Sequence, residues 1–289
     1  MEIRNKQTSK KTKLANRNIV LHQFVFCLLC ILTPACSQQQ EVRFSKVMAL
    51  PQLSSKTETL LQIGKSFLGT PYVASTLEQA GKEQLVVNLN ELDCWTFVEQ
   101  SIALTLTKHS KTPNFQQFKK ILQAFRYRNG KINGYGSRLH YFLEWLEQAK
   151  QNGIISLETE KIGGISVVKT IDFMSTHVQF YPALQDQEAY ENILAAEAKL
   201  SRLNWFYLPK NKVKAAESQL KEGDIITITA VKKGLDVVHE GLAIKKNGRI
   251  HLLHASLDFK EVVVSAEPLS DYLAKNKGQS GIIVARIME

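Results

Sequence analysis

The sequence predicts an α+β fold in which a group of helices precedes a mostly antiparallel sheet. Two observations support this prediction. Amphipathic helical patterns occupy the first two thirds of the chain, whereas alternating apolar stretches separated by turns follow residue 205. The length of 289 residues and the hydrophobic content of 44% are ordinary for a globular protein with one sizeable core. Helices followed by a run of strands are typical of the α+β class.

Residues 1–35 have the three parts of an export signal. A basic stretch is followed by an apolar run of about fourteen residues from Ile19 to Leu32, and then by small residues before Cys36. The run is shorter than the roughly twenty residues that a membrane-spanning helix needs. Ordinary cleavage before Cys36 and lipidation of Cys36 both stay open, because "LTPAC" matches a bacterial lipobox only in part. We expect an exported protein, either periplasmic or lipid-anchored in the bacterial envelope.

The charge of the chain does not indicate a nucleic-acid partner. The formal net charge is +10, but about half of the excess lies in the signal and would leave with it. No run of Lys and Arg is interleaved with aromatic residues, as a phosphate-binding surface would require. Residues 36–56 are polar and weakly patterned, which suits a linker or an extended N-terminal arm. We expect one domain over residues 57–289, acting as a monomer.

The elements of this domain follow from the spacing of its apolar residues. Patterns with a helical repeat predict helices at residues 57–68, 93–107, 114–126, 136–150 and 187–202. Later period-two patterns predict a strand in "GDIITITAV" and two more at Val237–Ile244 and Arg249–Ser256, which a Lys-Asn-Gly turn joins. The segment from about 110 to 205 is expected to be a helical elaboration that walls a cleft.

Cys94 is the one cysteine of the expected domain over residues 57–289. Asp93 can cap the helix that follows, although contact with substrate is a second role open to it. Cys94 then lies in the first helical turn, where unpaired N–H groups and the helix dipole stabilise a thiolate. A buried, inert thiol is the simpler explanation. A nucleophile with a pKa below the ordinary value of about 8.5 is the alternative that the position favours.

A thiolate nucleophile also needs a base, and the predicted hairpin offers histidines for this task. His239 and His254 lie on its two neighbouring strands. His251 and His254 are three residues apart, so they should point to opposite faces, and only one of them can join His239. A zinc site formed by Cys94 and these three histidines is a different use of the same residues. Strand parity and the absence of close metal-ligand spacing argue against it.

Several motifs together resemble a known family. "GTPY" at 69–72, "DCWTFVE" at 93–99, "DVVHEGLAI" at 236–244 and "LLHAS" at 252–256 occur in the order of the NlpC-like, papain-fold cysteine amidases of bacterial cell walls. The chain is most similar to a larger branch, described as N-acetylmuramoyl-L-alanine amidase-like. Further similar segments are "GYGSRLHYFLEWL" at 134–146, "DFMSTH" at 172–177, "GDIITIT" at 223–229 and "PLSDYL" at 268–273. The resemblance runs from about residue 57 to the end and implies a papain-like core.

Carried over residue by residue, the resemblance implies that Cys94 is the nucleophile, His239 the base and His254 the residue that orients the base. Tyr72 would offer its hydroxyl to the oxyanion or to the substrate. Glu240 departs from the family, which usually has an apolar residue after the catalytic histidine. On an alternating strand Glu240 should face away from His239 and affect packing more than chemistry.

The sequence therefore predicts a cysteine amidase without a cofactor. By resemblance, it hydrolyses the N-acetylmuramoyl-L-alanine bond of peptidoglycan or muropeptides through a thioester acyl-enzyme. Arg138 and His140 are candidate substrate contacts, although a surface ion pair and a structural histidine are simpler roles for them. A stem-peptide endopeptidase of the same superfamily and a non-catalytic muropeptide-binding lipoprotein are the alternatives. The intact set of one cysteine and two histidines argues against the binding protein.

Overall fold

The computed structural model describes residues 38–79 and 81–289. The expected export signal and Cys36 lie outside these residues. The chain divides into two compact units, Met1–Ser45 and Lys46–Glu289, and the second contains the whole sheet. Residues 38–48 are helical, where the sequence suggested an extended arm. Residues 38–50 contain neither Gly nor Pro and are rich in residues that favour helices, which the weak apolar pattern concealed.

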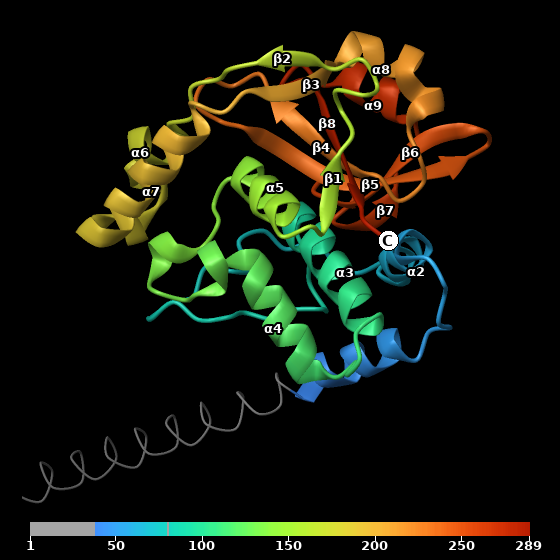
Figure 1. Ribbon diagram of the computed structural model, residues 1–289, viewed down its shortest axis with the longest axis horizontal. Helices are drawn as coiled ribbons and strands as arrows, with labels where there is room; N and C mark the ends of the chain where they lie inside the picture. Colours follow the sequence, from blue (N-terminus) through green and yellow to red (C-terminus); the bar gives the residue numbers. More distant parts are fainter. Residues whose placement is uncertain (1–37, 80) are drawn as a thin grey trace, which may run out of the picture. The chain divides into compact units, whose positions relative to one another are not determined.

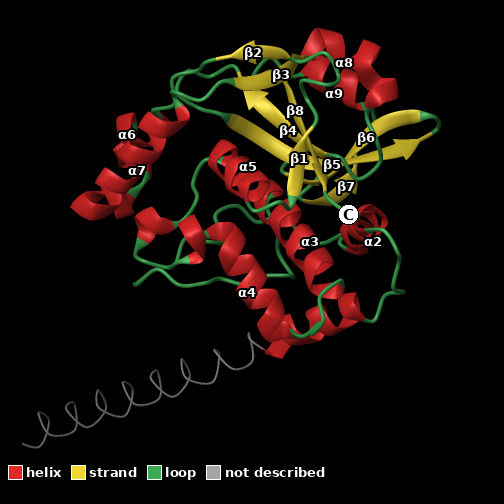
Figure 2. Cartoon of the chain, viewed as in Figure 1, coloured by secondary structure: helices red, strands yellow, loops and turns green. Residues whose placement is uncertain are grey.

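Among the described residues, eight strands form one sheet with antiparallel pairing throughout (Figure 2). The strand order is β2-β3-β8-β4-β5-β6-β7, and β1 pairs with β8. The strands are β1 Ile155–Leu157, β2 Ile165–Val167, β3 Trp205–Pro209, β4 Ile225–Ala230, β5 Val237–Lys246, β6 Arg249–Ser256, β7 Glu261–Val264 and β8 Gln279–Ile287. The predicted antiparallel sheet is confirmed. The segment 110–205 is not purely helical, because it supplies β1 and β2, which are too short for a period-two pattern to reveal.

The α-helices of the second unit include α2 Lys56–Ser66, α3 Cys94–Lys108, α4 Phe115–Arg126, α5 Phe142–Gln151, α6 Phe173–Thr176, α7 Gln187–Leu200, α8 Lys210–Ala216 and α9 Leu269–Lys275. Side chains that accept backbone N–H groups cap four of the five predicted helices, α2, α3, α4 and α7. No helix in the described part of the chain is long and apolar enough to span a membrane.

The helix predicted over residues 136–150 begins later, at Phe142. Gly134 has φ 69°, a left-handed conformation that favours glycine, and a 3₁₀ turn follows it at Tyr135–Ser137. Arg138 then forms an isolated antiparallel bridge with Tyr127. His140 consequently precedes α5 instead of lying within it.

Helices cover the two faces of the sheet, α2 and α3 on one face and α8 and α9 on the other (Figure 1). Alternate residues of β5 and β6 face these two layers. A Cβ atom added to Gly64 of α2 would meet Leu242 and Leu253. Ala243 and Leu252 instead join the apolar cluster that contains residues of α8 and α9. This alternation determines which layer each site residue faces.

Two irregularities shape the start of β5. The pairing with β4 shifts between Ile228 and Thr229, so that Val238 is an extra residue on β5. Pairing with β6 extends only from Leu242 to Lys246, up to a turn in which Asn247 and Gly248 both have positive φ. This confirms the predicted hairpin turn. Just before the paired region, a Cβ atom at Gly241 would lie 2.7 Å from the Leu253 carbonyl oxygen, so only glycine fits there.

A buried ion pair joins α3 to α4. Glu99 Oε2 accepts hydrogen bonds from Arg126 Nε at 2.9 Å and Nη2 at 2.6 Å. The two side chains are 0% and 2% exposed. Burial raises the pKa of Glu99, and the guanidinium of Arg126 opposes this rise. The attraction between the two charges therefore offsets the hydration that each of them loses on burial.

We expect Arg126→Met to lower the free energy of unfolding by about 3–5 kcal/mol, because it leaves the Glu99 carboxyl buried without its counter-ion. Adding Glu99→Leu should restore most of this loss, since two apolar side chains can replace a buried pair. Urea unfolding followed by circular dichroism measures both. Lys275→Met, which breaks an exposed pair with Glu267, is the control and should change little. A double variant that is no more stable than Arg126→Met would contradict the prediction.

Candidate active site

Cys94 is the first residue of α3, and its start is fixed by a reciprocal pair of hydrogen bonds. Thr96 N donates to Asp93 Oδ1 at 2.8 Å, and Asp93 N donates to Thr96 Oγ1 at 2.9 Å. This is a capping box, so the capping role expected for Asp93 is confirmed. Its contact with substrate stays a prediction. The thiol itself is free and partly exposed.

The Cys94 thiol lies against β5 and interacts with Glu240 at two points. The backbone N–H of Glu240 donates to the sulfur, and the thiol donates to the Glu240 carboxyl. The first residues of β5 have no partner on β6 in the strand register, which leaves this edge open to the start of α3. Glu240 directly follows His239 in β5, so the sulfur lies next to the strand segment that carries the histidine.

His239 and His254 form a tight pair on β5 and β6. Nε2 of His239 lies 2.5 Å from Nδ1 of His254, and the two rings are nearly perpendicular. Burial, with His254 as its neighbour, lowers the pKa of His239 to about 3. Burial likewise lowers the pKa of His254 to about 4. Both imidazoles are therefore neutral near pH 7, and Nδ1 of His239 is the ring nitrogen left for proton exchange.

His251 does not join this pair. Its Nδ1 lies 2.9 Å from the Ser265 carbonyl oxygen, to which it can donate. The four residues of the zinc alternative are thus not gathered in one place. Within the ranges that the structure describes, no group of three His, Cys, Asp or Glu residues could hold a metal ion.

Two tyrosines border the thiol and the histidine pair. Burial raises the pKa of Tyr72 to about 12, and charges on Cys94, Asp93 and Glu240 add to this effect. The Tyr72 hydroxyl therefore keeps its proton and can donate it in a hydrogen bond. Tyr272 of α9 packs on His254 and His239, with ring centroids 5.6 and 6.4 Å away. The sequence reasoning did not assign Tyr272 a role, and its only signal was its place in "PLSDYL".

The surroundings of Cys94 raise the pKa of its thiol well above the ordinary value. Burial is the main cause, followed by the charges of Glu240 and Asp93. The low thiol pKa that was expected from the start of a helix is therefore wrong, because these effects outweigh the helix terminus. The thiol and His239 are both neutral in the resting site.

Glu240 occupies a more important place than the sequence suggested. As expected, the alternation of β5 turns its side chain to the face opposite His239, where it is 4% exposed. That face holds the start of α3, so the carboxyl meets the thiol. Glu240 therefore acts on the electrostatics of the thiol in addition to its expected effect on packing. The signal for its position was a charged residue where a buried strand should be apolar.

Arg138 and His140, the other candidate substrate contacts, are engaged within the protein. Arg138 is 3% exposed and donates to the Leu77 carbonyl oxygen at 2.9 Å and to Glu78 Oε1 at 2.5 Å. His140 stacks on Tyr135 and hydrogen-bonds to its carbonyl oxygen at 2.9 Å. Among the described residues, neither side chain has a hydrogen bond or ring contact with Cys94 or the histidine pair. The guanidinium of Arg138 is buried, but its partner Glu78 is 53% exposed, so the expected ion pair lies at the surface on the glutamate side.

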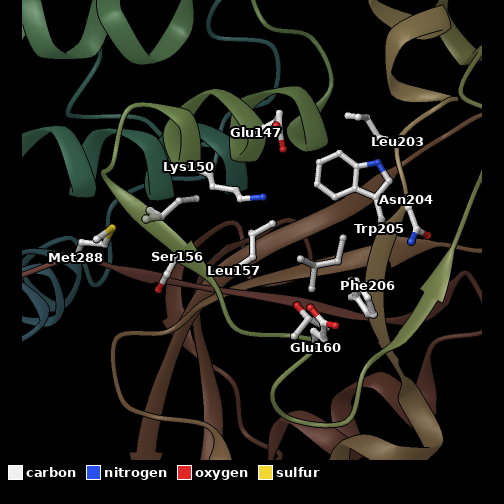
Figure 3. A pocket seen from close by; sticks show the side chains of 13 residues that line it. Glu147, Lys150, Ser156, Leu157, Glu160, Leu203, Asn204, Trp205, Phe206 and Met288 are labelled. Carbon is white, nitrogen blue, oxygen red and sulfur yellow. The ribbon is translucent and has the colours of Figure 1, made fainter.

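A cavity of about 600 Å³ lies where α5, β1, β3 and β8 meet (Figure 3). Trp205, Phe206 and Leu157 supply apolar surface, and Glu147 and Lys150 supply charge. Cys94, His239 and His254 are not part of its lining. This cavity is therefore separate from the candidate active site.

Comparisons with known proteins also indicate an amidase-like protein. A family described as N-acetylmuramoyl-L-alanine amidase-like matches residues 62–282. The crystal structure of an N-acetylmuramoyl-L-alanine amidase from Bacteroides uniformis is 40% identical, with a TM-score of 0.77, and the match covers 81% of this chain and 99% of that one. No curated protein matches the chain.

Two further solved structures are similar to this chain, at different levels of sequence identity. A Bacteroides fragilis protein, provisionally named as a xylanase, is 39% identical with a TM-score of 0.74, and the match covers 78% of this chain and 99% of that one. A protein from Legionella pneumophila is 22% identical with a TM-score of 0.67, covering 89% and 97%. At that identity the Legionella protein shows a shared fold alone.

Proposed function

Because this chain belongs to the N-acetylmuramoyl-L-alanine amidase-like family, we propose that it hydrolyses the amide bond between N-acetylmuramic acid and L-alanine in peptidoglycan or its fragments. The observation that carries the proposal is the Cys94 thiol beside the strand that holds His239, which is in turn bonded to His254. A nucleophile, a base and a group that orients the base are what covalent amide hydrolysis requires. We propose a papain-like cysteine mechanism on this basis.

The first half of the proposed reaction forms an acyl-enzyme. Since the thiol and the imidazole are both neutral at rest, the thiol proton moves to Nδ1 of His239 as the sulfur attacks the carbonyl carbon. His254 holds the other nitrogen of His239 meanwhile. Backbone N–H groups at the start of α3 and the Tyr72 hydroxyl are available to the oxyanion. Protonated His239 then gives its proton to the amine of L-alanine, the C–N bond breaks, and a thioester remains on Cys94.

The second half of the reaction restores the thiol. A water molecule gives a proton to His239 and attacks the thioester carbonyl. The C–S bond then breaks, and the sulfur recovers the proton from His239. The muramic acid product leaves as a carboxylic acid that loses its proton to solvent. No cofactor enters either half.

The bond that is cut can be read from the products of one muropeptide. With a disaccharide tetrapeptide as substrate, we expect free disaccharide and a tetrapeptide that begins with L-alanine. Mass spectrometry of the digest measures both. If L-alanine stays on the sugar while the stem is shortened, the protein is a stem-peptide endopeptidase and the bond assignment is wrong.

Two controls accompany this digest. The Cys94→Ala variant, prepared in the same way, reports products made by contaminating hydrolases. Xylan tests the activity named for the Bacteroides fragilis relative. Binding of the muropeptide without any product, under conditions in which the protein is folded, would instead support the non-catalytic alternative.

A further inference from the structure

Glu240 is a buried acidic residue whose surroundings are unusual for a carboxylate. The groups that act on it are Cys94 and Asp93 from the start of α3 and Asp236 from the residue before β5. Tyr72 is a further neighbour, and Thr227 lies opposite on β4. None of these groups carries a positive charge, and the buried Oε2 atom of Glu240 has no hydrogen-bond partner among the described residues. A carboxylate that is buried without a cation is costly, so this environment favours the neutral acid.

The two protonation states of Glu240 have opposite effects on the sulfur that it touches. As a carboxylate, Glu240 accepts the thiol proton in a hydrogen bond, and its charge opposes a second negative charge on the sulfur. As a neutral acid, it has an O–H group that can donate to the sulfur instead. The sulfur carries negative charge when it attacks and again when it leaves the acyl group. Only the neutral acid stabilises it at these moments.

We propose that Glu240 is a catalytic residue that acts as a neutral acid and donates a hydrogen bond from its carboxyl to the Cys94 sulfur whenever that sulfur is negatively charged. The carboxyl keeps its proton throughout, so His239 remains the group that receives and returns the proton of the thiol. The backbone N–H of Glu240 is a second donor to the same sulfur. This role rests on the proposed cysteine mechanism. It explains why an acid occupies a buried position of β5, on the same face as Leu242.

The role has a direct consequence for pH dependence. Burial raises the pKa of Glu240 to about 8, with Asp93 and Asp236 adding to the effect and the Cys94 hydrogen bond opposing it. Below this pH Glu240 is mainly neutral and donates. As the pH rises through about 8, it ionises, and the new charge works against the thiolate. We therefore expect kcat/KM of the unmodified protein to fall on the alkaline side.

Two variants separate the hydrogen bond from the shape of the side chain. Glu240→Gln keeps an N–H donor and cannot ionise, so the alkaline fall in kcat/KM should disappear or move up by about one pH unit or more. Glu240→Leu keeps the volume and removes the donor, so kcat at pH 6 should fall roughly 10²-fold. At that pH the Gln variant should retain at least about ten times the activity of the Leu variant. Glu222→Gln, which makes the same charge change at a residue bonded to Lys245 N, is the control and should keep the original pH profile.

Alkylation of Cys94 by iodoacetamide tests the same role without any substrate. Removing the Glu240 charge should lower the pH at which alkylation reaches half of its maximal rate in Glu240→Gln, and leave it unchanged in Glu222→Gln. Because this measurement needs no muropeptide, it remains decisive even if the proposed bond is wrong. Circular dichroism checks that each variant is folded, and the Gln variant suffices if the Leu variant is not. An alkylation profile and an alkaline limb of Glu240→Gln that both match the unmodified protein would overturn the proposal.

Discussion

Cys94→Ala should reduce amidase turnover by roughly 10⁴-fold or more, to the level of background hydrolysis, while the domain stays folded. The sulfur forms the covalent bond in the proposed reaction, so no other group in the site can replace it. The thiol is partly exposed at the start of α3, and alanine is the best helix former. We therefore expect the free energy of unfolding to change by less than about 1 kcal/mol.

Product release by liquid chromatography and unfolding by urea measure the two halves of this prediction. Cys94→Ser is the matched variant, because it keeps a hydroxyl in place of the thiol and tests whether any nucleophile suffices. A hydroxyl is a weaker nucleophile beside a neutral imidazole, so the Ser variant should also be inactive. A folded Cys94→Ala protein that cleaves muropeptides at the normal rate would exclude the cysteine mechanism.

The second large effect should come from His239. His239→Ala removes the group that carries the proton in both halves of the reaction, so turnover should fall by about 10⁴-fold. His254 acts through His239, as the 2.5 Å contact between their ring nitrogens indicates. His254→Gln keeps a polar side chain there, and we expect it to retain measurable turnover, about 10²-fold above His239→Ala.

His251 provides the control for this comparison, because it lies on the same strand as His254 and bonds to Ser265 instead. His251→Gln should leave the pH profile of kcat/KM unchanged. His254→Gln should shift that profile, because the imidazole it supports loses its partner, whereas a purely structural loss would lower the rate equally at every pH. A greater loss in His251→Gln than in His254→Gln would show that the other strand face carries the site.

Local patterns were sufficient to predict the elements that hold the site. The Asp93 cap, the apolar repeat of α3 and the Asn247–Gly248 turn are all encoded within a few residues, and each is present in the structure. The hairpin and strand parity predicted that only one of His251 and His254 joins His239, and the family resemblance selected His254, which the structure pairs with His239. These features need no knowledge of distant segments, which is why the sequence revealed them.

Features that depend on distant segments were missed. The short strands β1 and β2 form because β8 and β3 offer them hydrogen-bonding edges. Arg138 looked available to substrate, but it is buried and bonded to Leu77, Glu78 and Glu83. The raised pKa of Cys94 arises first from burial and then from the charge of Glu240, which packs against the start of α3, and no local pattern indicates either cause. Each of these errors concerns a tertiary contact that overrides a local tendency.

At Gly241, β5 approaches the backbone of β6 closely. The number of residues between Gly241 and the site residues is therefore as important as their identity. Beyond Gly241, the pairing that starts at Leu242 is fixed. Before it, the number of residues from this point determines which face of the sheet His239 reaches and which face Glu240 reaches. Adding or removing one residue at Gly241 would keep every chemical group and exchange the sides on which the imidazole and the carboxyl appear. A substitution in this stretch therefore changes one side chain, whereas a single-residue insertion displaces both the imidazole and the carboxyl.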